Sequence, residues 1–367
     1  MNASTEIQLI AMVTAVACAL PGAFLVLRRM AMMSDAISHT VLLGIVISFL
    51  LIGQLDSPWL ILGAALTGVL TVALVEMLNN TGLVKEDAAI GLVFPALFSA
   101  AVILISRFAR GVHLDIDAVL LGELAFAPFD RWQWGALDLP RGLVIMGTIL
   151  VANLGLIALF YKELKLATFD GELAAALGFS PVLLHYGLMG MVSVTAVGAF
   201  DVVGSVLVVA LMIAPPATAY LLTDRLSRML LYSGGLGGLA AVGGYALANW
   251  LDANIAGSMA AVAGLLFLAA FTFAPQRGLV SMAIRRSQQR LTFAQTMLTI
   301  HLLNHEGTER AAIENRVDHL WEHLRWQPDF AEQVVRYAER KGMVRRQQGY
   351  LLLTDDGRGM AQVAMMR

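Results

Sequence analysis

Residues 7–27 read IQLIAMVTAVACALPGAFLVL, a run without a charged side chain. A helix needs about 20 such residues to cross the roughly 30 Å hydrocarbon core of a bilayer. The run does not alternate between apolar and polar positions, as the strands of a membrane barrel do. No signal-peptide cleavage site accompanies it, so we expect the run to remain as a spanning helix. It therefore predicts an integral membrane protein.

The composition extends this prediction to most of the chain. Of 367 residues, 58% are hydrophobic and 14% are charged, and the mean hydropathy is +0.72. Soluble domains carry about 25% charged residues. The fold class predicted is an all-α polytopic membrane protein of eight or nine transmembrane helices. The predicted spans are 7–27, 35–54, 58–78, 88–106, 141–161, 182–200, 203–222, 229–248 and 257–275.

Charge divides the chain into two regions. Residues 1–280 hold 12 Lys or Arg and 17 Asp or Glu, a balance of −5, whereas residues 281–367 hold 13 and 10, a balance of +3. We expect a transmembrane domain over 1–280, a linker over 281–289 and a soluble domain over 290–367. The single cysteine, Cys18, excludes an internal disulfide and a cysteine-based metal cluster.

Short basic loops predict the orientation, because Lys and Arg collect on the cytoplasmic side. With nine spans, five basic connections share one side, which places the N-terminus outside and the C-terminal domain in the cytoplasm. They contain Arg28, Arg29, Lys85, Lys162, Lys165, Arg225, Arg228, Arg277, Arg285 and Arg286. The long outer loop also carries arginines, which weaken this prediction: Arg107, Arg110, Arg131 and Arg141.

The C-terminal region predicts a small α+β domain. Apolar residues have helical spacing over Leu291–Asn304 and Glu309–Leu324, and a third helix is expected from Pro328 to about Lys341. Residues 342–354 predict a β-hairpin, so the order is similar to a winged helix. Over 290–367 there are 11 basic and 10 acidic residues, a balance that does not favour nucleic-acid binding.

Asp35 and His39 stand at the head of the second predicted span. Four residues apart on a helix, the carboxylate and the imidazole share one face. Oxygen and nitrogen ligands suit Mn, Fe(II) or Zn, and ionisable groups in a span commonly line a pathway. The alternative is that Asp35 caps the helix and His39 lies at the membrane interface.

Residues 169–178 predict a short amphipathic helix in a cytoplasmic loop, ended by a glycine. A short helix between two spans can dock a soluble partner, and the alternative is a plain connection. Its candidate docking residues are Phe169, Asp170, Glu172, Leu173, Ala176, Leu177 and Gly178.

Further polar residues are weaker candidates. His301 with His305, and His319 with His323, are pairs at a spacing that can chelate a transition metal, although surface histidines without a ligand are common. Glu86 and Asp87 precede a span and predict helix capping. The remaining polar positions are expected in outer loops or turns: His113, Asp115, Asp117 and Asp201.

Four stretches resemble the manganese/zinc/iron permease family of ABC importers. They are residues 33–44 (MSDAISHTVLLG), 85–91 (KEDAAIG), 169–178 (FDGELAAALG) and 203–219 (VGSVLVVALMIAPPATA). Their order and spacing match over about residues 5–275, and the C-terminal domain is similar to the winged helix of metal-dependent repressors. No Gly-x-x-x-x-Gly-Lys-Ser/Thr phosphate loop is present, so an ATP-driven transporter needs another chain for hydrolysis.

The resemblance implies a transport subunit rather than an enzyme, in the bacterial inner membrane and without a permanently bound cofactor. It implies a second permease copy or paralogue, an ATPase subunit docked through 169–178, and an extracytoplasmic metal-binding protein. Asp35 and His39 would line the ion path. Two alternatives remain at this stage: a permease for a metal chelate or vitamin, and a membrane-anchored metal sensor with the C-terminal domain as its output.

Overall fold

The computed structural model describes residues 2–53, 58–108, 124–134, 137–309, 311–320 and 324–366. The chain forms two compact units, Met1–Gly278 and Leu279–Arg367. Among the candidates from the sequence, His113, Asp115, Asp117 and His323 lie outside the described residues.

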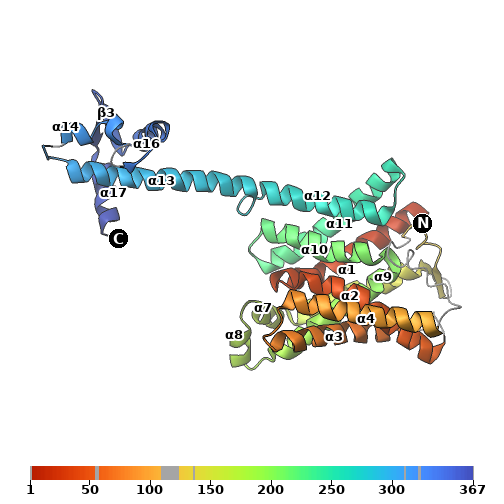
Figure 1. Ribbon diagram of the computed structural model, residues 1–367. Helices are drawn as coiled ribbons and strands as arrows, with labels where there is room; N and C mark the ends of the chain where they lie inside the picture. Colours follow the sequence, from red (N-terminus) through yellow and green to blue (C-terminus); the bar gives the residue numbers. More distant parts are fainter. Residues whose placement is uncertain are drawn as a thin grey trace. The chain divides into compact units, whose positions relative to one another are not determined.

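Nine helices in the described part of the first unit are long and apolar enough to cross a membrane, which confirms the predicted polytopic fold. The colours in Figure 1 follow the order of these helices along the chain, from red at the N-terminus. Most of their ends lie within a few residues of the predicted spans. The helices are α1 (Ala3–Leu27), α2 (Ala31–Ile52), α3 (Pro58–Asn80), α4 (Glu86–Phe108), α6 (Arg141–Leu159), α9 (Pro181–Val203), α10 (Ser205–Leu222), α11 (Leu226–Leu251) and α12 (Ile255–Phe273).

Helix α1 is the central helix of this bundle, packed against α6, α9, α10 and α11. Small residues let the backbones approach closely, as is typical of helices in membranes. A Cβ atom at Gly22 would collide with the main-chain oxygen of Met212 on α10. One at Gly44 of α2 would collide with the main-chain oxygen of Gly63 on α3. Glycine at these crossings therefore sets the helix spacing.

A small hairpin, β1 (Arg131–Trp134) and β2 (Leu137–Pro140), precedes α6. Nη1 of Arg131 lies 2.9 Å from buried Glu6 of α1, and its Nε lies 2.8 Å from Asp138. Hydrogen bonds to these carboxylates raise the pKa of Arg131. Arg141 lies 3.7 Å from Asp130. Two of the outer-loop arginines are thus charge-paired, which reduces their conflict with the predicted orientation.

Two short helices, α7 (Tyr161–Phe169) and α8 (Gly171–Ala176), connect α6 to α9. Asp170 separates them and caps α8, because its Oδ1 accepts a hydrogen bond from the Leu173 amide at 2.9 Å. Gly178 follows with a φ of +88°, a conformation that favours glycine. In Figure 1 α7 and α8 lie at the end of the bundle opposite the N-terminus.

The second unit begins with α13 (Leu279–His305), which includes the residues 281–289 expected as a linker. It continues with α14 (Ala311–Glu314), the 3-10 helix η1 (Val317–His319), α16 (Pro328–Arg340), the antiparallel strands β3 (Val344–Gln347) and β4 (Tyr350–Leu353), and α17 (Asp355–Met365). The predicted third helix and hairpin are confirmed. Apolar side chains of α13, α16 and both strands form its core, among them Leu298, Val334, Val335, Val344 and Leu351.

The prediction of one continuous helix over Glu309–Leu324 is wrong. Helix α14 ends at Glu314, and Arg316 has an extended backbone that pairs with Tyr350 of β4. The Leu351 amide donates to the main-chain oxygen of Asn315 at 2.8 Å. Pairing with a strand more than 30 positions away in the printed sequence replaces the local helix.

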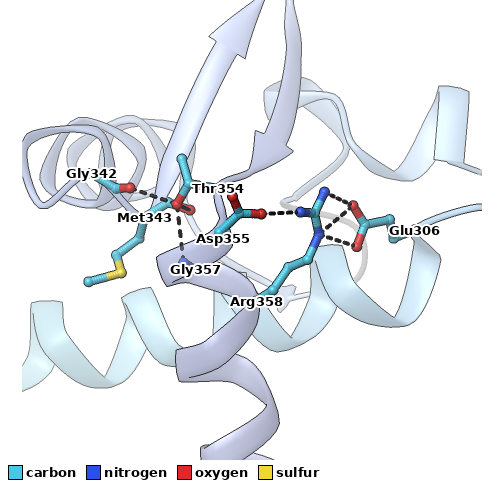
Figure 2. Close-up of polar contacts among 7 residues, drawn as sticks. All are labelled: Glu306, Gly342, Met343, Thr354, Asp355, Gly357 and Arg358. Carbon is cyan, nitrogen blue, oxygen red and sulfur yellow. Dashed lines mark hydrogen bonds and ion pairs between the residues drawn. The ribbon is translucent and has the colours of Figure 1, made fainter.

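Polar contacts attach α17 to the rest of this unit (Figure 2). Oγ1 of Thr354 caps α17 through the Gly357 amide at 3.1 Å and donates to the main-chain oxygen of Gly342 at 2.7 Å. Arg358 lies 2.7 Å from Glu306 and 2.8 Å from Asp355. The end of α13 and the start of α17 are therefore joined through one guanidinium group.

Candidate functional site

Asp35 and His39 lie on the same face of α2, as their spacing predicts. Nε2 of His39 is 3.6 Å from Oδ1 of Asp35, and both side chains are partly exposed. Helix α2 begins at Ala31, after Met30 at the cap position. Asp35 therefore lies inside the helix and does not cap it. His39 lies roughly 12 Å along the helix axis from Ala31.

Contacts with two neighbouring helices, α4 and α3, surround the Asp35–His39 pair. The His39 ring centroid is 5.2 Å from that of Phe94 and 6.1 Å from that of Phe98, both on α4. Next to His39, Oγ1 of Thr40 accepts a buried hydrogen bond of 2.7 Å from Thr71 of α3. The aromatic contacts and the buried hydrogen bond hold α2 between α3 and α4, so the pair stands on fixed helices.

The chemistry of this pair suits a passing cation better than a resident one. A carboxylate oxygen and an imidazole nitrogen are ligands for Mn, Fe(II) and Zn. Two protein ligands leave half or more of the coordination positions of such an ion to water or to another chain. Sparse coordination allows quick release, which a transport path requires. A second copy of the chain would supply two further ligands.

A second polar cluster lies at the end of the bundle where α7 is found, and sequence reasoning missed it. Nη1 of Arg28 lies 3.1 Å from Nδ1 of His185, and Nε2 of His185 lies 2.6 Å from Glu76. Nε of Arg28 also donates to Oγ1 of Thr168 on α7 at 3.2 Å. Burial lowers the pKa of the Arg28 guanidinium, but arginine keeps its proton in proteins. The cluster connects α3, α7 and α9 to the end of α1.

The residues expected at the docking helix form an apolar surface. Phe169, Leu173 and Leu177 are 61%, 46% and 61% exposed, whereas Ala174 is fully buried between them. The remaining candidates are exposed with them: Asp170, Glu172, Ala176 and Gly178. Large apolar side chains gathered on an exposed turn are typical of an interaction site.

In the second unit, the structure brings together two of the predicted histidines and one residue that the sequence analysis missed. One ligand atom each of His301, His305 and Glu314 lies within 4.8 Å of the other two. His319, in η1, is outside this group. Glu314 could have been found from the sequence only if the short α14 had been recognised, because α14 turns back toward α13.

The other polar candidates lie where expected or nearby. Glu86 and Asp87 occupy the first turn of α4, where carboxylates are favourable. Asp201 is exposed in the last turn of α9, just before Gly204 with a φ of +77°.

Comparison with known proteins gives consistent matches. The sequence profile of the ABC 3 transport family matches residues 4–274. The zinc transport system membrane protein TroD of Treponema pallidum is 50% identical over 360 residues, with 98% of each chain covered. The manganese transport system membrane protein MntD of Bacillus subtilis is 51% identical over 271 residues, with 74% of this chain and 92% of MntD covered. A solved chain of PsaBC from Streptococcus pneumoniae in complex with Fab is 29% identical, with a TM-score of 0.65, and covers 77% of this chain and 96% of that one.

Proposed function

This chain belongs to the ABC 3 transport family, and from that membership we propose that it is the permease subunit of an ATP-driven importer of a divalent transition metal, Mn, Zn or Fe. The observation that carries the proposal is the Asp35–His39 pair on α2, 3.6 Å apart and partly exposed within the bundle. The names of TroD and MntD support zinc or manganese as the cargo. The ion is the substrate, and we expect no permanently bound cofactor.

ATP hydrolysis belongs to a partner subunit in this proposal, since the printed sequence has no phosphate loop. The ATPase would dock on the apolar surface of Phe169, Leu173 and Leu177, with Asp170, Glu172, Ala176 and Gly178 around it. ATP binding would draw two ATPase subunits together and move α7 and α8. The bundle would then open the Asp35–His39 site to one side of the membrane at a time.

The remaining partners follow from the same proposal. A second permease, identical or a paralogue, would complete the path, because the Asp35–His39 pair supplies only two ligands to an ion. An extracytoplasmic metal-binding protein would deliver the ion, and lipid would surround the spans in the bacterial inner membrane, where we propose that the chain lies.

We place the second unit in the cytoplasm, as the positive-inside rule predicts. We propose a transmembrane domain over 1–280 and a separate domain over 290–367, linked by residues 281–289, which belong to the first part of α13. The passage from α16 into the hairpin β3–β4 supports a winged-helix-like assignment for this unit. Its acidic residues on α16, among them Glu332 and Glu339, pair with Arg346 and so disfavour nucleic-acid binding.

The alternatives make different demands on the path. A permease for a metal chelate or vitamin needs a wide path and no ligand pair, whereas Asp35 and His39 lie together beside two aromatic rings. A membrane-anchored sensor needs no transport at all.

The test is competitive uptake of labelled Mn, Zn and Fe into vesicles that carry the assembled transporter, native or with His39→Ala. We expect ATP-dependent uptake of one of these metals and its loss in the variant. Absence of uptake of any metal by a folded complex with its ATPase and delivery protein would favour the chelate or sensor alternative.

A further inference from the structure

The second unit contains a group of side chains that could bind a metal ion and that do not belong to the proposed transport path. We propose that His301, His305 and Glu314 form a binding site for a divalent transition metal ion, and that occupancy of this site slows transport. The regulatory half of this inference rests on the proposed transport function, whereas the binding site itself does not.

The three side chains lie close together, but their ligand atoms are farther apart than in a metal-bound site. One ligand atom of each lies within 4.8 Å of the others, and the two imidazole centroids are 4.8 Å apart. In a tetrahedral zinc site with bonds of about 2.0–2.1 Å, neighbouring ligand atoms are about 3.4 Å apart. His305 is the last residue of α13 and is partly exposed, so its side chain has room to close that difference.

The backbone explains why these residues meet. Helical spacing places His301 and His305 on one face of α13, and α14 returns to bring Glu314 to the same face. Nε2 of His301 is 3.2 Å from the main-chain oxygen of Glu314, a contact that restrains the ring. Metal-binding imidazoles commonly use their second nitrogen in this way. The carbonyl groups at the end of α13 also favour a cation.

The ligand types indicate which ions fit. Two imidazole nitrogens and one carboxylate oxygen suit Zn, Mn and Fe(II), whereas Ca²⁺ and Mg²⁺ prefer oxygen ligands alone. Glu314 is 6% exposed and His301 is 9% exposed. A carboxylate removed from water is stabilised by a nearby cation, so an ion would suit this position. The site therefore selects the same class of ion that we propose as the cargo.

The neighbourhood of the site suggests how an ion could change this unit. Glu306 follows His305 directly and pairs with Arg358 of α17 at 2.7 Å (Figure 2). An ion that joins His305 to Glu314 would fix the last turn of α13 against α14, next to the contact that holds α17. Binding would thus hold α13, α14 and α17 more rigidly together. The rigidity of this unit would then depend on the metal concentration in the cytoplasm, where we place it.

Binding is tested on the purified full-length chain in which Asp35→Asn and His39→Ala remove the proposed path ligands. Equilibrium dialysis with Zn²⁺ or Mn²⁺ measures affinity, and Co²⁺ absorption reports histidine and carboxylate coordination. We expect one bound ion, at least tenfold weaker binding after His305→Ala or Glu314→Gln, and unchanged binding after His319→Ala. Added metal should raise the melting temperature only where the three ligands are intact. Equal affinity in all variants, or no binding by the folded parent chain, would overturn the site.

Regulation is tested by uptake into vesicles that contain ATP, with or without preloaded Zn²⁺ or Mn²⁺, using the complete transporter. Preloading should slow the native protein at least threefold and leave the His305→Ala protein unchanged. If both proteins transport and respond equally, the regulatory inference fails while the proposed function stands. If neither transports any metal, the proposed function and its regulation fail, but the dialysis result still decides whether the site exists.

Discussion

Nη1 of Arg28 lies 3.1 Å from Nδ1 of His185, and the chemistry of arginine fixes the direction of this hydrogen bond. A guanidinium only donates, so Nδ1 accepts and the ring proton is on Nε2. That nitrogen faces Glu76 at 2.6 Å. His185 is therefore a neutral bridge between a cation at the end of α1 and a carboxylate on α3, and Arg28 extends the bridge to Thr168 of α7.

Replacing this bridge should destabilise the bundle. His185→Leu removes the contacts of His185 with Arg28 and Glu76, and the loss of these polar contacts should cost about 1–3 kcal/mol. His185→Gln keeps one acceptor and one donor and should restore most of the stability. Thermal unfolding in detergent measures the difference, and a Leu variant as stable as the native protein would contradict the role of the bridge. If the bridge also transmits motion from α7, the Leu variant should consume more ATP for each ion transported.

Asp35→Asn and His39→Ala should each reduce metal uptake at least tenfold, which corresponds to about 1.4 kcal/mol in the barrier to transport. The melting temperature should change little, since partly exposed ion pairs contribute about 0–1 kcal/mol to stability. Asp252→Asn is a matched control, because Asp252 is an exposed residue with a φ of +51° that asparagine tolerates. Full uptake by the Asp35→Asn, His39→Ala double variant would refute the assignment of the path.

Charged substitutions on the apolar surface of α8 should weaken docking of the ATPase subunit without unfolding the bundle. Leu173→Asp and Leu177→Asp place charges on side chains that are 46% and 61% exposed, so the bundle should remain folded. Copurification of the ATPase subunit should fall sharply for both variants. Val363→Asp, at a 57% exposed position of α17, is the control and should retain the ATPase. Undiminished copurification with Leu177→Asp would place the docking surface elsewhere.

The pair Glu306–Arg358 predicts how the stability of the second unit depends on pH. Hydrogen bonds from Arg358 lower the pKa of the Glu306 carboxyl below its ordinary value. A lowered pKa in the folded state means that the stabilisation is complete above the unfolded value of about 4.3 and is lost as pH falls through the folded value. Through this pair, the free energy of unfolding of the second unit, followed by hydrogen exchange, should therefore not vary with pH near 7 and should fall below about pH 4. Arg358→Gln should abolish this part of the pH dependence, and because the pair is exposed its effect should shrink in high salt.

Local patterns predicted the helical bundle and the proximity of Asp35 and His39 well. Runs of about 20 apolar residues suffice for spanning helices, and a four-residue spacing on a helix brought Asp35 and His39 to 3.6 Å. The bridge of Arg28, His185 and Glu76 was beyond such reasoning, because its members come from three distant parts of the chain. The one available signal was that Glu76 and His185 fall inside predicted spans, where ionisable groups need partners.

The second unit shows the same limit. The predicted hairpin and α16 depend on local turn and helix signals, and both are present. The predicted helix over Glu309–Leu324 failed because Arg316 pairs with Tyr350, a contact that no local pattern announces. The same break in the helix accompanies the turn that brings Glu314 toward His301 and His305.

The role of glycine in setting helix spacing can be tested by comparing two glycine-to-alanine substitutions, one at a crowded position and one at an open position. A Cβ atom at Gly22 would collide with the main-chain oxygen of Met212, whereas one at Gly155 of α6 meets no atom within 4 Å among the described residues. Both changes to alanine carry the same gain in helix propensity, up to about 1 kcal/mol, so their difference isolates the collision. Forced overpacking costs about 1–3 kcal/mol. Gly22→Ala should lower the melting temperature and Gly155→Ala should not. Equal melting temperatures would mean that α1 and α10 can separate without loss, and that this glycine does not set their spacing.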